Sequence, residues 1–170
     1  KHAHGDSEGA VPLLRQAVAV DSTFAMAWRK LAVVLPQAVP GSGDESQNAA
    51  KRAYQYRDRL PPVERGLTEA YYYNVVADDP AKVEAAYRSV LAVNPDEPTA
   101  LNNLGLMLNS EGRPEEAEVL LRHLVATSDI QSGLINLIGS LMQQGKDAAA
   151  DSALAELRRR NPTRAPTAAH

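Results

Sequence analysis

The sequence of 170 residues contains no cysteine. This absence excludes disulfide bonds, thiolate nucleophiles and cysteine-ligated zinc sites. It does not distinguish a reducing compartment from an oxidising one, so the localisation stays open between the cytoplasm and the periplasm.

Long apolar runs are absent as well. The longest unbroken one extends from about Leu31 to Leu35, whereas a helix that spans a bilayer needs about 20 apolar residues. No charged-then-apolar signal opens the chain, so we predict a soluble segment without direct membrane insertion. Because the sequence starts at Lys1 rather than at a methionine, we expect a piece of a longer protein.

An excess of positive charge is also lacking. The formal net charge is −3, which gives no overall positive field to attract nucleic acid. The positive runs are Lys51-Arg52 with Arg57 and Arg59, and Arg158-Arg159-Arg160. We interpret the first as an exposed face and the second as cations that oppose a helix dipole, and we predict no nucleic-acid partner.

Signatures of catalysis are missing too. There is no phosphate-binding Gly-rich loop, no His-Glu-x-x-His pair and no Gly-x-Ser-x-Gly turn. His2 and His4 have only Asp6 and Glu8 nearby, and His123 has no ligand partner by sequence. We predict a protein that is not an enzyme and that uses no metal or cofactor.

What the sequence does contain is an internal repeat. The clearest copy consists of Leu101-Asn102-Asn103-Leu104-Gly105, Leu108, Gly112, Ala117 and Leu121. A counterpart placed 34 residues later consists of Ile135-Asn136-Leu137-Ile138-Gly139, Met142, Gly145, Ala150 and Leu154, with one residue fewer at its turn. More degenerate copies precede these two. We therefore expect one solenoid domain over 1–170, divided into a half repeat at 1–24, repeats at 25–63, 64–97, 98–131 and 132–165, and a tail at 166–170.

Each half of a repeat carries apolar residues with the period of an amphipathic helix, and no segment alternates like a strand. This predicts an all-α chain of about nine antiparallel-paired helices. The boundary signals are Asp44 and Asp79 as N-caps, Pro62, Pro80, Pro98 and Pro114 in first turns, and Gly112 and Gly145 in tight turns. The small residues expected to let paired helices approach closely are Ala32, Gly105, Ala117, Gly139 and Ala150.

This pattern resembles the tetratricopeptide repeat family, whose unit of about 34 residues is a pair of helices. The shared features are a large residue early in the first helix, a Leu-Gly pair one turn later, an alanine in the second helix and a closing proline. The match is most specific over 98–162, whereas Tyr71 and Asn74 depart from it. The resemblance implies an α-α superhelix that offers a concave groove to a protein or peptide partner.

A finer resemblance concerns the segment from Asp58 to Tyr72. It is similar to a stretch in repeat regions appended to bacterial serine/threonine protein kinases and related signalling proteins. The kinase signatures themselves do not occur in this sequence, so any catalytic domain would lie outside it.

The family resemblance also implies which side chains meet a ligand, because the first helix of each repeat lines the concave face. The candidate binding residues are Arg29, Lys30, Val33, Arg65, Thr68, Tyr72, Asn102, Asn103, Leu106, Asn109, Asn136, Ser140 and Gln143. We hypothesise that the asparagine and glutamine amides pair with the main chain of a peptide and that the cationic residues meet its acidic groups. The alternative is that the amides only solvate a helix face or cap turns.

Tyrosines are densest at Tyr71, Tyr72 and Tyr73. Three consecutive helical residues point about 100° apart and cannot share one face, so we expect Tyr72 to turn toward the groove. The alternative is core packing that compensates for the irregular repeat.

Three function classes follow from these features. The first is a non-catalytic scaffold that binds a protein or an extended peptide. The others are a self-associating structural module and a regulatory module of a larger bacterial signalling protein such as a serine/threonine kinase. No dedicated capping helix is evident for the first half repeat or for the final helix from Asp147 to Arg160. We therefore predict either homo-oligomers that form through these ends or, in a longer parent protein, continuation into further repeats.

Overall fold

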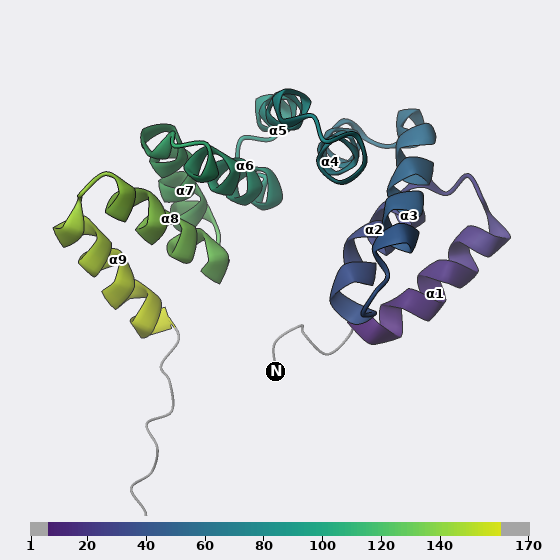
Figure 1. Ribbon diagram of the computed structural model, residues 1–170, viewed down its shortest axis with the longest axis horizontal. Helices are drawn as coiled ribbons and strands as arrows, with labels where there is room; N and C mark the ends of the chain where they lie inside the picture. Colours follow the sequence, from purple (N-terminus) through teal and green to yellow (C-terminus); the bar gives the residue numbers. More distant parts are fainter. Residues whose placement is uncertain (1–6, 161–170) are drawn as a thin grey trace, which may run out of the picture. The chain divides into compact units, whose positions relative to one another are not determined.

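The computed structural model describes residues 7–160, and these form nine α-helices joined by short connections (Figure 1). No strand occurs within this range, so the predicted all-α helical-repeat class is confirmed. The chain divides into two compact units, Lys1–Pro95 and Asp96–His170, which we name unit 1 and unit 2. His2, His4 and the predicted tail at 166–170 lie outside the described residues.

Unit 1 contains five α-helices and two short turns of other helix types. The elements are α1 (Ser7–Val20), α2 (Ala25–Ala38), α3 (Gly43–Gln55), the 3-10 turn η1 (Arg57–Arg59), α4 (Pro62–Tyr72), the π-helical turn η2 (Tyr73–Ala77) and α5 (Pro80–Val93). Helix α2 packs against α1 and α3, and α4 packs against α5. The core around α2 consists of Val11, Val18, Ala27, Leu31, Ala32, Leu35, Ala49 and Ala50. Its alanines are small enough to let α2 and α3 lie close together.

The departure from the repeat pattern at Tyr71 and Asn74 has a structural basis in unit 1. The Tyr71 hydroxyl donates a hydrogen bond to the carbonyl oxygen of Ala32 at 2.9 Å, and the Ser46 hydroxyl donates to the same oxygen at 2.8 Å. The ring of Tyr71 therefore reaches from α4 to the α2–α3 pair, where its polar end is satisfied. Asn74 is exposed in η2, after which the helix ends at Asp78 with a left-handed φ of 51°.

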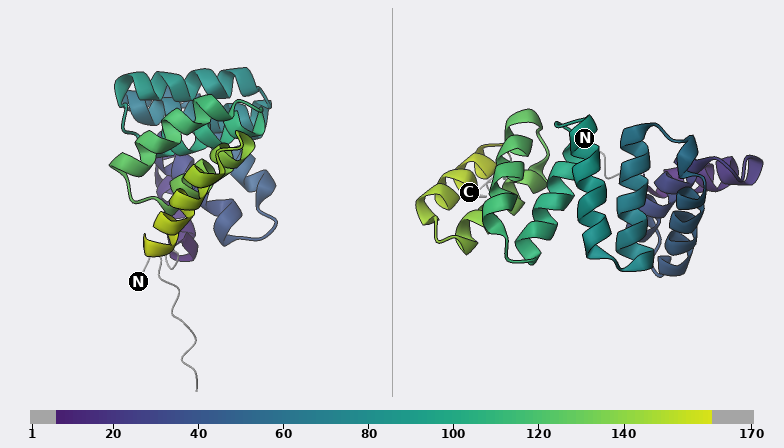
Figure 2. Two further views of the ribbon diagram at one scale, coloured as in Figure 1. Left: turned by 90° about the vertical axis from the view of Figure 1, so that its left-hand side faces the viewer. Right: turned by 90° about the horizontal axis from the view of Figure 1, so that it is seen from above.

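Unit 2 contains α6 (Pro98–Ser110), α7 (Pro114–Thr127), α8 (Gln131–Gln143) and α9 (Asp147–Arg160), each packed against the next (Figure 2). Its core is rich in leucine. The largest fully buried side chains are Leu101, Leu104, Leu108, Leu121, Leu124, Leu134 and Leu141. Helix α6 approaches α7 closely at Gly105, because a Cβ atom there would lie 2.7 Å from Cγ of Leu121.

The register of the repeats in unit 2 differs by one residue from the sequence alignment. Leu134 is 1% exposed, whereas Ile135, which the alignment places in the core, is 52% exposed. Helix α6 begins at position 98 and α8 at position 131, a spacing of 33 residues rather than 34. A Cβ atom at Gly139 would have no neighbour within 4 Å, so the close approach predicted at this glycine is wrong.

Most predicted helix boundaries are confirmed. The prolines found in first turns are Pro62, Pro80, Pro98 and Pro114. Asp79 is an N-cap whose carboxylate accepts a backbone N–H three residues on at 3.1 Å. Gly112 and Gly145 adopt left-handed φ values of 73° and 66°, which glycine reaches without a steric penalty. Asp44 is not an N-cap, because α3 already begins at Gly43; its carboxylate lies in the first turn, where the helix dipole favours it.

Candidate functional site

The two first helices of unit 2, α6 and α8, are joined by a ladder of amide and hydroxyl groups. Asn136 Nδ2 and the Ser132 hydroxyl both donate to Asn102 Oδ1, at 3.1 and 2.9 Å. Further along the helices, Asn109 Nδ2 donates to the carbonyl oxygen of Asn136 at 3.1 Å, and the Ser140 hydroxyl donates to Asn109 Oδ1 at 2.6 Å. We call these five residues the amide ladder.

The amide ladder contains most of the polar groups that the sequence assigned to peptide binding in unit 2. Ser140 is fully buried, and Asn102, Asn109 and Asn136 already hydrogen-bond within the protein. A peptide main chain would have to displace these bonds in order to bind, which removes most of the net gain. The ladder therefore holds neighbouring repeats together.

Exposed apolar side chains accompany the ladder on the same two helices. Leu106 on α6 is 52% exposed, and Ile135 and Met142 on α8 are 52% and 63% exposed. Ile135, Gly139 and Met142 follow the spacing i, i+4, i+7, so they share one face of α8. Sequence reasoning found Leu106 but missed Ile135 and Met142 because of the one-residue error in register. The 33-residue spacing between the two turn glycines was the signal that could have corrected it.

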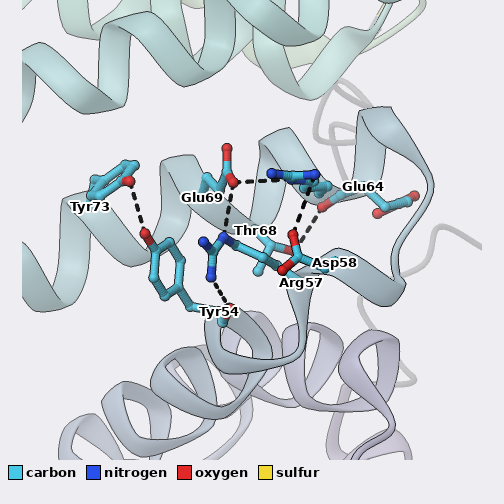
Figure 3. Close-up of polar contacts among 8 residues, drawn as sticks. Tyr54, Arg57, Asp58, Glu64, Thr68, Glu69 and Tyr73 are labelled. Atoms are coloured by element: carbon cyan, nitrogen blue, oxygen red, sulfur yellow. Dashed lines mark hydrogen bonds and ion pairs between the residues drawn. The ribbon is translucent and has the colours of Figure 1, made fainter.

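Ion pairs hold two of the three predicted cationic residues of unit 1, Arg29 and Arg65. Arg29 of α2 pairs with Glu64 of α4, and both side chains are partly buried. Glu69 accepts from Arg57 Nε at 3.1 Å and from Arg65 Nε at 3.3 Å, which links η1 to α4 (Figure 3). Arg29 and Arg65 were predicted to contact a ligand. Both therefore already form ion pairs with carboxylates of the chain.

Thr68 points into the protein rather than toward an open face. It is 2% exposed, and its hydroxyl donates to the carbonyl oxygen of Glu64, one turn earlier in α4, at 2.7 Å (Figure 3). Its neighbour on the same helix, Gly66, is also buried, against Val90 of α5. Thr68 consequently supports α4 from within.

A tyrosine cluster, made of Tyr54, Tyr72 and Tyr73, joins α3 to the end of α4. The rings of Tyr54 and Tyr72 stack with centroids 4.0 Å apart, and Tyr73 meets each ring edge-on at 5.7 Å. The guanidinium of Arg57 lies 4.0 Å from the centre of the Tyr54 ring. The hydrogen bond with Tyr54, at 3.0 Å, and partial burial raise the pKa of Tyr73 to about 12 (Figure 3). Tyr72 is half-buried, so packing occupies much of its ring.

A pocket of about 360 Å³ opens between α1 and α2 in unit 1, and we call it the α1–α2 pocket. Its apolar lining consists of Ala10, Leu13, Leu14, Val33 and Val34, and its polar lining consists of Arg29 and Lys30. Lys30 is exposed and forms no hydrogen bond or ion pair with any described residue. The Nε atom of Arg29 is buried without a hydrogen-bond partner among them. The structure thus brings three predicted contacts together in one accessible hollow.

Comparison with known proteins agrees with the repeat architecture. The model of the tetratricopeptide repeat family matches residues 75–129. The crystal structure of TTC0263, a thermophilic tetratricopeptide repeat protein of Thermus thermophilus, superposes with a TM-score of 0.73 at 16% identity, over 94% of this chain and 86% of that one. Residues 75–129 are thus similar in sequence to the tetratricopeptide repeat family, and the fold is similar to that of a tetratricopeptide repeat protein.

Two further proteins are similar to this chain. YrrB, described as a tetratricopeptide repeat protein with an unusual peptide-binding site, matches with a TM-score of 0.59 at 16% identity, over 94% of this chain and 80% of YrrB. The cytochrome c-type biogenesis protein CycH of Bradyrhizobium diazoefficiens is 26% identical over 146 residues, which cover 81% of this chain and 39% of CycH. The chain therefore spans about two fifths of the length of this relative.

Residues 7–160 hold no group of three or more His, Asp or Glu side chains placed to bind a metal ion. His123 pairs with Asp96 at 2.7 Å on the surface of unit 2. None of the described helices has the length and apolar character needed to cross a membrane.

Proposed function

We propose that this chain is a non-catalytic scaffold that binds a protein partner on the exposed faces of its first helices. The observation that carries the proposal is the α1–α2 pocket. It combines accessible apolar surface with two cationic side chains, Arg29 and Lys30, and sites of this composition suit the apolar and acidic side chains of a polypeptide.

The proposed contacts differ between the two units. In unit 1 they are Arg29, Lys30, Val33, Arg65 and Tyr72, and in unit 2 they are Asn103, Leu106, Ile135, Met142 and Gln143. Thr68 and the amide ladder support these faces without touching the partner. Apolar contact, rather than pairing of amides with a peptide main chain, supplies most of the binding in this proposal.

A second proposal concerns the process in which the scaffold acts. Because the similar protein CycH is named a cytochrome c-type biogenesis protein, we infer that the partner takes part in the assembly of c-type cytochromes. Two other candidates remain. A regulatory module of a bacterial signalling protein such as a serine/threonine kinase rests on the segment from Asp58 to Tyr72, and a self-associating module rests on the first half repeat and the final helix from Asp147 to Arg160.

Affinity capture tests both proposals. The protein would be immobilised, exposed to extract of its source organism and compared with a Val33→Asp, Leu106→Asp double variant by mass spectrometry. Val20→Asp is the matched control, because Val20 is 91% exposed on α1 outside the proposed faces. Saturable retention of one defined protein by the wild type and the control, but not by the double variant, supports the scaffold function. Equal retention by all three, or by none, contradicts it, and a retained protein unrelated to cytochromes contradicts the second proposal.

A further inference from the structure

A further pocket of unit 1 lies between α2 and α3, and we call it the Trp28 pocket. Its volume is about 470 Å³. Trp28 of α2 lines it together with a row of α3 residues, among them Glu45, Lys51, Arg52 and Gln55. The pocket shares no residue with the α1–α2 pocket or with the contacts named in the proposed function. It is therefore a separate candidate site.

The pocket lies where a large side chain of a first helix meets a helix of small ones. In the other first helices, the position of Trp28 holds a buried leucine, which is Leu67, Leu101 or Leu134. Trp28 is larger and only half-buried. The buried residues of the adjacent α3 are all small: Ser46, Ala49, Ala50 and Ala53. Helix α3 thus buries no bulky side chain against the indole, and part of the ring stays accessible.

The indole of Trp28 is fixed at its polar edge. Its Nε1 atom donates a hydrogen bond to the carbonyl oxygen of Ser22 at 2.9 Å. Because this N–H already has an acceptor, the accessible part of the ring offers apolar and aromatic contact to a ligand rather than a hydrogen bond. A ring whose orientation is already fixed loses little conformational entropy when a ligand packs on it.

The charges beside the ring favour an acidic ligand. Lys51 is exposed and forms no hydrogen bond or ion pair through its side chain within residues 7–160. Arg52 is also exposed, and its guanidinium donates at 3.3 Å to the neutral amide oxygen of Gln55. Both carboxylate oxygens of Glu45 accept from Arg15, at 2.8 and 2.7 Å. Two cations therefore lie near the indole without a carboxylate of the described chain to pair with them.

The length of the lining suits several consecutive residues of a polypeptide. Glu45 and Gln55 are ten positions apart on α3, which corresponds to about 15 Å along the helix axis. An extended chain covers this distance with about four or five residues.

We propose that the Trp28 pocket binds an extended acidic segment of a partner protein. In this segment, an aromatic side chain packs on Trp28, and the carboxylates that flank it pair with Lys51 and Arg52. The site goes beyond the proposed function, because it lies outside the faces assigned to the partner there and selects for negative charge.

Fluorescence provides a direct test, because Trp28 is the single tryptophan of the sequence. The blocked peptide Asp-Asp-Phe-Asp-Asp would be titrated into the whole chain and compared with Asn-Asn-Phe-Asn-Asn and Asp-Asp-Ala-Asp-Asp. We expect the first peptide to shift the Trp28 emission to shorter wavelength in a saturable way, since its phenylalanine displaces water from the indole. The other two should bind at least about fivefold more weakly, because one lacks the ion pairs and the other lacks the ring.

A charge reversal in the pocket sharpens the test. Lys51→Glu should weaken binding of the acidic aromatic peptide at least about fivefold and leave that of the neutral peptide unchanged. The matched control is Arg158→Glu, which reverses an exposed cation on α9 in unit 2 and should alter neither affinity. Circular dichroism of both variants checks that they fold.

Three results would overturn the inference. The first is a Trp28 emission that does not respond in a saturable way to the acidic aromatic peptide. The second is equal binding of all three peptides, or equal weakening by Lys51→Glu and Arg158→Glu, because either would reduce the contact to non-specific attraction. The third is an emission that changes with protein concentration alone and loses this dependence in Lys51→Glu, which would assign the pocket to a second copy. Partner capture by the first helices is measured with the Val33→Asp, Leu106→Asp variant, so the proposed function stands or fails independently.

Discussion

Unit 1 and unit 2 are built from the same kind of helix pair, yet their first helices use polar residues in different ways. In unit 2, a leucine core and the amide ladder fix α6 against α8, so the amides face the neighbouring repeat. In unit 1, ion pairs and the tyrosine cluster connect α4 to its neighbours, and Lys30 stays available beside an apolar pocket. Where the repeat follows the family pattern, polar residues of the first helix stabilise the fold. The accessible groups of unit 1 lie on α1 and α2, apart from the departures from the pattern at Tyr71 and Asn74.

The largest expected effect comes from truncating matched leucines of the two units. Leu121 is fully buried under α6, so Leu121→Ala should lower the free energy of unfolding by about 2–5 kcal/mol. Leu14 is half-buried beside the pocket, and Leu14→Ala should lower the free energy of unfolding by less than about 1.5 kcal/mol. Urea unfolding followed by circular dichroism measures both losses, and fluorescence of the single Trp28 reports on unit 1 separately. Equal losses at the two sites would show that α1 is covered as fully as α7.

Two glycines test the register of unit 2. Gly105→Ala should destabilise the protein by about 1–3 kcal/mol, because the new methyl group would overlap the buried Leu121 side chain. Gly139→Ala should instead stabilise it by about 0.5–1 kcal/mol, since the site is open and alanine favours the helix. Thermal unfolding of both variants gives the comparison. If Gly139→Ala lowers the thermal stability as much as Gly105→Ala does, the 34-residue alignment is the correct one.

These glycines also mark what the sequence could predict about the fold. Helical periodicity, the prolines at helix starts and the glycine turns were sufficient to predict the nine helices of residues 7–160 and several of their boundaries, among them the starts of α4, α5, α6 and α7. Both glycines follow an apolar residue in the same short pattern, so local sequence does not tell which one touches a neighbouring helix. That depends on the rotation of α8, and a single residue of register turns a different side chain into the core.

The placement of the proposed binding residues was partly predictable from the sequence. The family resemblance identified the first helices, and Arg29, Lys30 and Val33 do meet in one pocket. The hydrogen bonds among the amides of unit 2 were not predictable, because their partners on the adjacent helix cannot be identified from the sequence alone. The pocket itself was missed, since it depends on how α1 and α2 pack together and which of their side chains stay accessible.

The amide ladder can be weakened at one position. Ser140→Ala should lower the free energy of unfolding by about 1–2 kcal/mol, because it removes the hydroxyl that donates to Asn109 Oδ1 in a fully buried place. Ser110→Ala, at the exposed end of α6, is the control and should have little effect. If both changes are neutral, the ladder contributes no net stability, and its amides would be free to exchange partners with a peptide.

Acid should affect unit 2 through Glu118. Hydrogen bonds from Lys146 and Arg122 lower the pKa of Glu118 to about 2, from an ordinary value of 4.5. Because the folded state holds this carboxylate ionised, its stabilisation is present above pH 4.5 and is lost as the pH falls toward 2. Glu118→Gln should lower the free energy of unfolding by about 1 kcal/mol at neutral pH. The stability of this variant should also change less between neutral and acidic pH. Thermal melts of both proteins between neutral and acidic pH test this. If the melting temperatures of the two proteins depend on pH in the same way, Lys146 and Arg122 do not lower the pKa of Glu118.

The smallest and most local of the expected effects is a change in the pKa of Tyr73 in the tyrosine cluster. Tyr54→Phe removes the hydroxyl that bonds Tyr73 but keeps the ring that stacks on Tyr72, so the pKa of Tyr73 should fall from about 12 toward 10. In the wild type, the fold favours the neutral phenol, and stability is lost as the pH rises from 10 toward 12. Absorbance of tyrosinate during an alkaline titration measures the shift, with Tyr56→Phe as the control. An unchanged titration would mean that burial alone holds Tyr73 neutral. The cluster would then be an apolar joint between α3 and α4 rather than a hydrogen-bonded one.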